Sequence, residues 1–538
     1  MGQTPPRSSM QRILQSPPRS RFKRYWLGAW RWAPLALLLV PWGLCNGPIR
    51  DGDLAEWKAK LSSPQKRVRR SALGPLVSLD SLVAWELVVK ALGDSAGEVA
   101  DGAQLLLGEM DDPGELELML GKSGLRSKSD WVRRRVVEAL GRVQAPVPIG
   151  ALQRGLKDRD AEVRRMAAWS IERLAQGEAW LEGLDARERR ELAGKLRACA
   201  SSDRDPTVQA RALCALVPLD PEAARVLWKS FTKGRSIGLR CVALKLAPAL
   251  MDPELALAAL AAAAQGPELL LRGQAQETLA QWGTKPALGA LIECFPLEED
   301  PRLAFLLLQR LRALSGLKHR ADVRPWRAWC AQLTDDWRAP EPRTAATERK
   351  ATPRDDASSS LSFSGLELRS LRLSFLIDLS GSMWTPGADG RTAKQVVEGK
   401  LASALEGLPE EARFNLIPYT SKPIPWADSL QPASKRNKAR ALAHFADCSQ
   451  RGSGNFWAAA MLALEDPEVD TLVVLSDGAP SGGERYELDL IVSHFEELNL
   501  TRRVAVDSVL VDASWRLQGY WQRLAACTGG ESISVAFP

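Results

Sequence analysis

One segment constrains the fold of this chain more than any other: an apolar run that ends abruptly in a carboxylate, a glycine and two hydroxyls. It reads Phe375-Leu376-Ile377-Asp378-Leu379-Ser380-Gly381-Ser382-Met383. A parallel strand covered on both faces is a continuous apolar run, so 373–377 is predicted to be such a strand. Open α/β sheets place ligands at the carboxyl ends of their strands. Asp378, Ser380 and Ser382 offer only oxygen donors there, which suit Mg²⁺, Ca²⁺ or Mn²⁺ better than zinc or copper.

Strands and helices alternate through the C-terminal third of the sequence. The spacing predicts strands at 413–419, 471–476, 504–511 and 532–537, separated by helices at 392–408, 436–447, 455–464, 486–498 and 515–527. This alternation predicts βαβ units and therefore an α/β doubly wound, mostly parallel, Rossmann-like sheet. The strand at 471–476 ends in Asp477, so two acidic groups are expected at neighbouring strand ends. Two carboxylates placed this way repel each other unless a cation lies between them.

The D-x-S-G-S string at Asp378, the order of the elements and the Asp477-Gly478 turn together resemble the von Willebrand factor type A (VWA) family. The resemblance covers 368–538, which we expect to form one domain. It implies a metal-ion-dependent adhesion site (MIDAS) in which Asp378, Ser380, Ser382 and Asp477 bind Mg²⁺, or else Mn²⁺ or Ca²⁺. In the family this metal keeps one open coordination position, which an aspartate or glutamate of a partner completes. The implied partner is a protein that presents an acidic residue.

The sequence departs from the family at the second loop of that site. The family has a threonine in a G-G-T-N-like turn, whereas Gly452-Ser453-Gly454-Asn455 places Gly454 at the threonine position. Glycine has no hydroxyl, so one direct ligand is missing, and Ser453 or a water is the available substitute. The alternative is a silent site, in which Asp378 and the serines only cap the following helix and tighten the turn. The second carboxylate, Asp477, favours the metal site.

A second pattern returns about every 30–35 residues between 50 and 335, as expected of helical repeats. Copies carry an acidic turn, a valine and an arginine, as in Asp130-Trp131-Val132-Arg133 and Asp160-Ala161-Glu162-Val163-Arg164. Apolar residues at i, i+4 and i+8 give each helix one buried stripe, so neighbouring copies must stack. The units resemble HEAT and armadillo-like repeats, which implies an all-α helical solenoid with a long concave surface for peptides or proteins. The arginines are predicted to pair with turn aspartates of adjacent repeats, or to line a solvated face, rather than to bind phosphate.

Two further segments lie outside these folded parts. Residues 1–46 begin with a basic stretch and continue into an apolar run, Trp32 to Cys45, which is typical of a signal peptide or a membrane anchor. This predicts an exported or membrane-anchored protein on the periplasm-like side of a cell envelope, whether or not the segment is cleaved. Residues 336–367 are rich in proline, alanine, serine, threonine and charge, so we expect a flexible linker that lets the VWA domain move relative to the solenoid.

Composition limits the functions that this chain can have. The formal charge of the 538-residue chain is +7, but much of it lies in 1–46, so no nucleic-acid partner is predicted. The 8 cysteines lack C-x-x-C spacing and there are 3 histidines, which argues against zinc and Cys/His catalysis. We therefore expect a non-enzymatic protein-binding protein whose solenoid supplies a second interaction surface. The alternatives are a structural scaffold with a silent metal site and an accessory subunit of an ATPase or chelatase-type complex.

Overall fold

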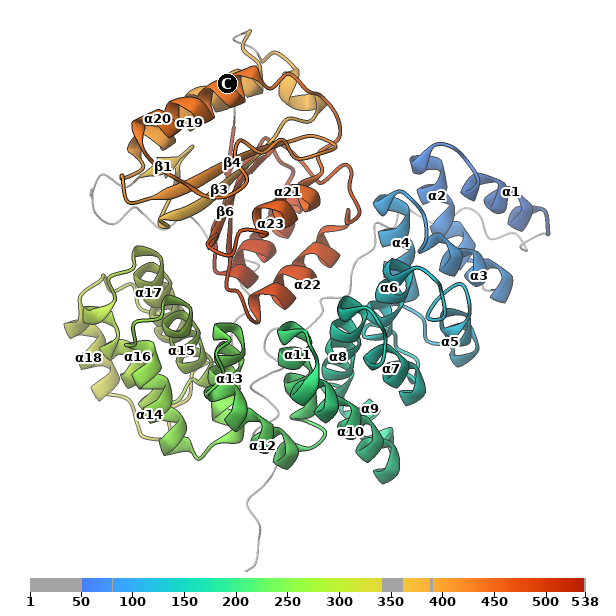
Figure 1. Ribbon diagram of the computed structural model, residues 1–538, viewed down its shortest axis with the longest axis horizontal. Helices are drawn as coiled ribbons and strands as arrows, with labels where there is room; N and C mark the ends of the chain where they lie inside the picture. The colour runs from blue at the N-terminus through green and yellow to red at the C-terminus, as the bar shows by residue number, and fades with distance from the viewer. Residues whose placement is uncertain (1–50, 80, 341–360, 388–389, 537–538) are drawn as a thin grey trace, which may run out of the picture.

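The computed structural model describes residues 51–340 and 361–536, apart from residues 80 and 388–389. Figure 1 separates two parts: an arc of helices followed by a sheet with helices on its faces. This confirms the predicted fold class, an α-helical solenoid followed by a mostly parallel α/β domain. The predicted signal or anchor segment, 1–46, lies outside the described residues. Within the described ranges, none of the helices is long and apolar enough to span a membrane.

The solenoid has two layers of helices. The inner layer faces the hollow of the arc and contains α2 (Lys66–Val77), α4 (Gly97–Leu107), α6 (Asp130–Leu140), α8 (Ala161–Ala175), α11 (Pro206–Leu216), α13 (Ile237–Leu250), α15 (Leu269–Trp282) and α17 (Pro301–Ser315). The outer layer contains α1 (Asp51–Leu61), α3 (Leu82–Ala91), α5 (Pro113–Leu120), α7 (Ile149–Leu156), α9 (Glu178–Gly183), α10 (Ala186–Ser202), α12 (Pro221–Thr232), α14 (Pro253–Ala264), the 3₁₀ turn η3 (Phe295–Leu297), α16 (Lys285–Glu293) and α18 (Val323–Ala331). Each inner helix packs against the next one along the arc, and the stacked helices bury two hydrophobic clusters, one over 73–250 and one over 260–326.

An aspartate of the acidic turn begins three of the inner helices, α8, α11 and α17. The Asp160 side chain accepts a hydrogen bond from the Val163 amide at 3.0 Å, and Asp300 accepts one from the Leu303 amide at 2.9 Å. These caps satisfy amides that have no partner inside the helix. The apolar residue that donates the amide is itself buried, since Val163 is 0% and Leu303 6% exposed. One short motif therefore starts the helix and supplies its first core contact.

The arginine after that valine pairs with an aspartate at the start of the next helical unit. Three such pairs each have two parallel hydrogen bonds of 2.7 and 2.8 Å: Arg133 with Asp158, Arg164 with Asp203 and Arg69 with Asp94. This fork-to-carboxylate geometry is the strong form of the interaction. The predicted pairing is confirmed, and these arginines join neighbouring units rather than forming a phosphate-binding ladder.

The C-terminal domain is built on a six-stranded sheet with the order β5-β4-β3-β6-β7-β8, in which only the β4–β5 edge pair is antiparallel. The strands are β3 (Arg372–Asp378), β4 (Arg413–Tyr419), β5 (Gln431–Pro432), β6 (Thr471–Ser476), β7 (Ala505–Val511) and β8 (Ser532–Val535). The helices are η4 (Gly381–Trp384), α19 (Ala393–Gly407), α20 (Lys435–Asp447), α21 (Phe456–Ala463), α22 (Leu488–Asn499) and α23 (Trp515–Thr528). Because β3 and β6 are parallel neighbours, their carboxyl ends lie side by side.

The central strand β3 is covered on both faces, as its apolar sequence predicts. Phe375 and Ile377 belong to the core under α19 and α20, whereas Leu376 belongs to the core under α21, α22 and α23. All three side chains are 0% exposed. Burial on both faces leaves the loop after the carboxyl end of β3, where Gly381 and Ser382 are exposed, as the place where a ligand can approach Asp378.

The boundaries of the predicted linker need correction at both ends. Residues 362–367 form a hairpin of β1 (Ser362–Phe363) and β2 (Leu366–Glu367), and β1 packs against α19. The C-terminal domain therefore begins before residue 368. At the other end, the Ala339 amide donates to the Gly283 carbonyl at 2.8 Å, which ties 339 to the solenoid. Residues 341–360 lie outside the described residues.

The C-terminal domain occupies the hollow of the solenoid, with α22 facing the inner helices (Figure 1). Polar contacts join the two parts along the whole arc: Arg70 with Glu487, Arg134 with His494, Arg211 with Glu497, Arg503 with Glu277, and Arg302 with the Asp470 carbonyl. Two predictions are therefore wrong. The domain is held against the solenoid instead of moving freely, and the concave surface is covered by the chain itself. The physical reason is charge complementarity between segments far apart in the sequence, which no local pattern reveals.

We predict that Arg133→Ala lowers the unfolding free energy by about 2–3 kcal/mol, because it leaves the carboxylate of Asp158 without its partner in a site where both side chains are mostly buried. Chemical denaturation followed by circular dichroism measures this change. Arg187→Ala is the matched control, because the Arg187 side chain is 82% exposed and pairs only with Glu191 on the same helix. An equal effect of the two substitutions would contradict the proposed role of the inter-repeat pairs.

Candidate metal site

Asp378 is the buried centre of the candidate site. It ends β3, is 3% exposed, and accepts the Ser380 amide at 2.8 Å and the Ser476 hydroxyl at 3.0 Å. Burial raises the pKa of its carboxyl to about 6, and the nearby negative charge of Asp477 adds to the rise. Its hydrogen bonds act in the opposite direction but are too few to offset burial. The site therefore holds a carboxylate that lacks a compensating positive charge among the described residues.

The two predicted serines of the first loop lie next to each other. The Ser380 and Ser382 hydroxyl oxygens are 3.3 Å apart, with Ser380 mostly buried and Ser382 exposed at the start of η4. Neither serine caps the following helix, because Thr392 makes the cap of α19 with its own side chain. The helix-cap part of the silent-site alternative is therefore wrong, although Asp378 does tighten the turn through the Ser380 amide.

Asp477 follows β6 directly, so it lies at the strand end next to Asp378, and its charge contributes to the raised pKa of Asp378. Sequence reasoning missed Ser476, the residue before it, whose hydroxyl bridges the Asp378 carboxylate and the Gly478 carbonyl. The signal was present, because the apolar run Thr471–Ser476 ends in a hydroxyl at the same edge.

In the second loop, Gly454 rather than Ser453 is the residue that lies beside Asp378. The Ser453 hydroxyl lies 3.1 Å from the Ser421 hydroxyl, which engages it away from Asp378. Gly454 is the residue that lies against Asp378: a Cβ built there would be 2.9 Å from Asp378 Oδ2. The Gly454 amide donates to the Ser481 hydroxyl at 2.7 Å, so Ser481 is a second hydroxyl that sequence reasoning missed. In this arrangement, a side chain at 454 would displace the carboxylate.

The donor chemistry fits a hard divalent cation. Two carboxylates and several hydroxyls gather at one edge, and Mg²⁺ is commonly held by one or two carboxylates while it keeps several waters. Among the described residues, no group of three or more His, Cys, Asp or Glu side chains is placed to hold a metal. At this edge, Asp378, Ser380, Ser382 and Asp477 are the residues that would hold the ion, with water completing the shell.

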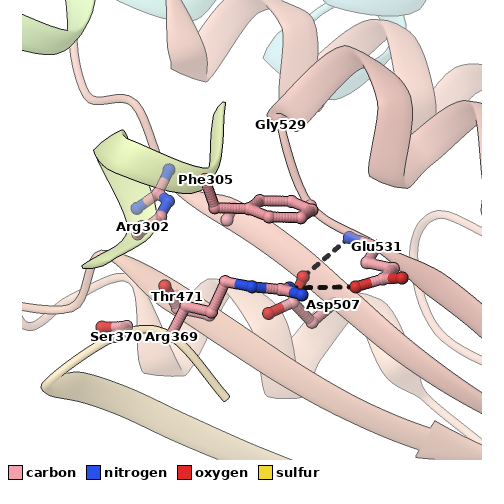
Figure 2. A pocket seen from close by; sticks show the side chains of 10 residues that line it. Arg302, Phe305, Arg369, Ser370, Thr471, Asp507, Gly529 and Glu531 are labelled. Carbon is pink, nitrogen blue, oxygen red and sulfur yellow. Dashed lines mark hydrogen bonds and ion pairs between the residues drawn. The ribbon is translucent and has the colours of Figure 1, made fainter. Parts of the chain in front are cut away.

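A separate small cavity lies between α17 and the amino ends of the central strands (Figure 2). Its charged walls are paired with each other: Arg369 lies over the Phe305 ring and binds Glu531 at 3.0 Å, and Asp507 accepts the Glu531 amide at 2.7 Å. Because Arg302 and Phe305 of the solenoid line this cavity together with residues of the C-terminal domain, it belongs to the interdomain contact. It lies at the sheet edge opposite Asp378.

We predict that Gly454→Ala lowers the unfolding free energy by about 1–3 kcal/mol, since the added methyl meets the Asp378 carboxylate. Thermal and chemical unfolding measure the loss. Gly478→Ala serves as the control on the adjacent loop, because nothing lies within 4 Å of the Cβ it adds. Equal stabilities of the Gly454 variant and the wild type would show that this close approach is absent.

A second prediction concerns pH in metal-free buffer. Asp378 has a native pKa of about 6, above that of an unfolded aspartate, so between about pH 4 and 6 the native state holds a proton that the unfolded state has lost. Stability should therefore fall as pH rises through this window, by up to about 1.4 kcal/mol per pH unit. Asp378→Asn should remove this part of the slope in denaturation curves recorded across the window. The same pH dependence of stability in the variant and the wild type across this window would contradict the raised pKa.

Sequence comparison finds that residues 122–216 match the family described as HEAT repeats. Inter-alpha-trypsin inhibitor heavy chain H4 of Homo sapiens is 28% identical over 201 residues, which cover 30% of this chain and 21% of that protein. Inter-alpha-trypsin inhibitor heavy chain H2 of Sus scrofa is 32% identical over 122 residues, which cover 20% of this chain and 12% of that protein. The chain thus spans about a fifth or less of these curated relatives.

Among solved structures, the von Willebrand factor type A protein from Catenulispora acidiphila is similar over 32% of this chain and 40% of its own, with 16% identity and a TM-score of 0.26. The SpRpn10 VWA domain is similar over 30% of this chain and 87% of its own, with 14% identity and a TM-score of 0.24. The central parallel strands, the Asp378 turn and the repeat match agree with the predicted organisation. The chain therefore combines HEAT repeats with a C-terminal VWA-like domain.

Proposed function

We propose that this chain is a non-enzymatic protein-binding protein whose VWA-like domain recognises an acidic side chain of a partner through a divalent cation. The observation that carries the proposal is the pair Asp378 and Asp477 at neighbouring strand ends, where burial and mutual repulsion raise the pKa of Asp378. A bound cation would neutralise both groups and offset the penalty of ionising Asp378.

The exposure of each residue of the site suggests whether it would bind the ion from below or lie on the side that a partner approaches. Asp378 is buried and held by Ser380 and Ser476, so it would fix the ion at the base of the site. Ser382 is exposed and Asp477 half-buried, so they lie on the side from which solvent and a partner approach. The bound ion would supply a positive charge with an exchangeable position, and a carboxylate is the ligand of opposite charge that suits it.

In this proposal the concave surface of the solenoid does not bind an external partner, although helical repeats of this kind imply that it would. Its inner helices are engaged by the VWA-like domain, so a further partner would have to use the outer helices or the rim of the arc. Among the described residues, five large hydrophobic side chains on outer-layer elements are exposed: Leu82 and Val83 on α3, Val226 on α12, Leu255 on α14 and Leu297 on η3. We infer that the inner layer presents the metal site and that the outer layer is the surface left for other contacts.

We predict that the full chain binds Mn²⁺ or Mg²⁺ at one site and that Asp378→Asn abolishes this binding, because the amide removes the charge at the base of the site. Asp477→Asn should weaken binding by about 10-fold or more, consistent with the loss of one charged ligand. Isothermal titration calorimetry and Mn²⁺ electron paramagnetic resonance measure both effects.

Asp507→Asn is the matched control for this titration. Asp507 is also a buried carboxyl of the same sheet with a pKa raised by burial to about 6, but it lies at the opposite edge. Wild-type affinity in the Asp507 variant would assign the ion to the Asp378 edge. Absence of binding to the wild-type chain at millimolar Mn²⁺ would instead favour the structural scaffold with a silent site.

A further inference from the structure

The loop between Asp477 and α22, residues 477–487, connects the candidate site to the solenoid. On the site side, Ser481 exchanges two hydrogen bonds with Gly454: the Gly454 amide donates to the Ser481 hydroxyl at 2.7 Å, and the Ser481 amide donates to the Gly454 carbonyl at 3.0 Å. Gly482 and Gly483 then cross the second loop closely, because a Cβ on either would overlap Ser453 or Asn455. The third loop of the site is thus packed on the second, next to Asp378.

On the solenoid side, Arg485 anchors the same loop. Its side chain is 1% exposed and binds Glu138 at 2.7 Å and Gln104 at 2.8 Å, with Asp101 at 3.6 Å. Asp101 is 0% exposed and also accepts the backbone amides of Tyr486 at 2.5 Å and of Glu487 at 2.9 Å. The inner helices α4 and α6 therefore hold both the side chain and the backbone of this loop.

Three more contacts fix the middle of the loop. Arg135 on α6, which also pairs with Asp101, donates to the Glu484 carbonyl at 2.7 Å. Lys66 on α2 donates to the Ser481 carbonyl at 3.0 Å. A Cβ on Gly97 of α4 would lie 2.1 Å from the Gly483 carbonyl oxygen, so the two backbones touch. A continuous series of contacts therefore runs from the solenoid through Ser481 to Gly454 and the Asp378 carboxylate.

The buried cluster of Arg485, Asp101 and Glu138 should be destabilised when any one of these side chains is removed. Burial alone would lower the pKa of Arg485, but Glu138 and Asp101 outweigh burial, and the net direction is upward. Burial likewise opposes ionisation of Glu138, yet Arg485, Arg142 and Arg134 bring its pKa down to about 2. Removing one partner from such a buried cluster leaves the other charges without compensation, which is strongly destabilising locally.

From this series of contacts we propose that the solenoid is part of the metal site: Arg485 and Asp101 are positioning residues that hold the loop 477–487 so that Asp477 stays beside Asp378 and Ser481 stays hydrogen-bonded to Gly454. This inference rests on the proposed function and adds to it a structural role for the HEAT repeats. Divalent-ion affinity should depend on inner helices that contribute no ligand. Residues that orient metal ligands typically change affinity by about 10–100-fold when removed.

The test is a Mn²⁺ titration of the full chain carrying Arg485→Met, which keeps the length of the side chain but removes the charge. We expect Mn²⁺ affinity to fall about 10–100-fold and deuterium uptake of residues 477–484 to rise in hydrogen-exchange mass spectrometry. Asp101→Asn, which preserves shape, is the second variant and should act in the same direction. If the Arg485 variant does not fold, the same Mn²⁺ titration can still be made with the Asp101 variant.

Arg503→Met is the matched control. Arg503 belongs to the same interdomain contact and binds Gln274 and Glu277 at 2.9 and 2.7 Å, but it lies beyond the other end of α22. We expect it to lower thermal stability while leaving Mn²⁺ affinity and uptake at 477–484 unchanged. If Arg485→Met and Asp101→Asn bind Mn²⁺ as tightly as the wild type, or if Arg503→Met weakens binding equally, the positioning role is overturned and the proposed function stands. If the wild-type chain binds no Mn²⁺, the proposed function falls and this inference falls with it.

Discussion

Pairing of arginine with carboxylate is the interaction on which this structure depends at two levels. Between repeats, the guanidinium of Arg133 and its counterparts joins one helical unit to the next through parallel hydrogen bonds. Between the two parts of the chain, Arg485, Arg211 and Arg503 place the same chemistry in a mostly buried contact. A planar fork with five donors can bind a carboxylate through two parallel hydrogen bonds and still donate to a backbone carbonyl, whereas a lysine offers a single nitrogen. Arginine–carboxylate pairs therefore stabilise both the stacking of the repeats and the docking of the C-terminal domain.

At the candidate site, the buried carboxylate of Asp378 destabilises the fold locally when it is ionised. Asp378 is held away from water beside a second carboxylate, and its hydrogen bonds come only from a backbone amide and a serine hydroxyl. A chain selected for stability alone would place an apolar residue or an amide at this strand end. Gly454 adds to this picture, because its missing side chain leaves room for the carboxylate in its present position. Sites that violate the ordinary rules of burial in this way are typical of function.

Sequence patterns predicted the features that depend on neighbours in the chain. The apolar run of β3, the alternation of strands and helices, and the acidic turn that begins repeat helices are all local, and the structure has each of them. The docking of the domain could not be predicted, because Arg485 and its partner Gln104 are 381 positions apart and neither lies in a distinctive motif. The hydroxyls of Ser476 and Ser481 were missed for a related reason: the contacts of Ser476 with Asp378 and of Ser481 with Gly454 are made by segments that meet only in the folded domain.

The domain that fills the arc also changes its mechanics. An open stack of helical repeats has contacts only between neighbours, so it can stretch and twist like a spring. Here a compact body is bonded to α2 at one end and to α17 at the other, through Arg70 and Arg302. The C-terminal domain thus links the two ends of the arc, and widening the arc would require these two contacts to break. These contacts therefore oppose any change in the curvature of the repeats.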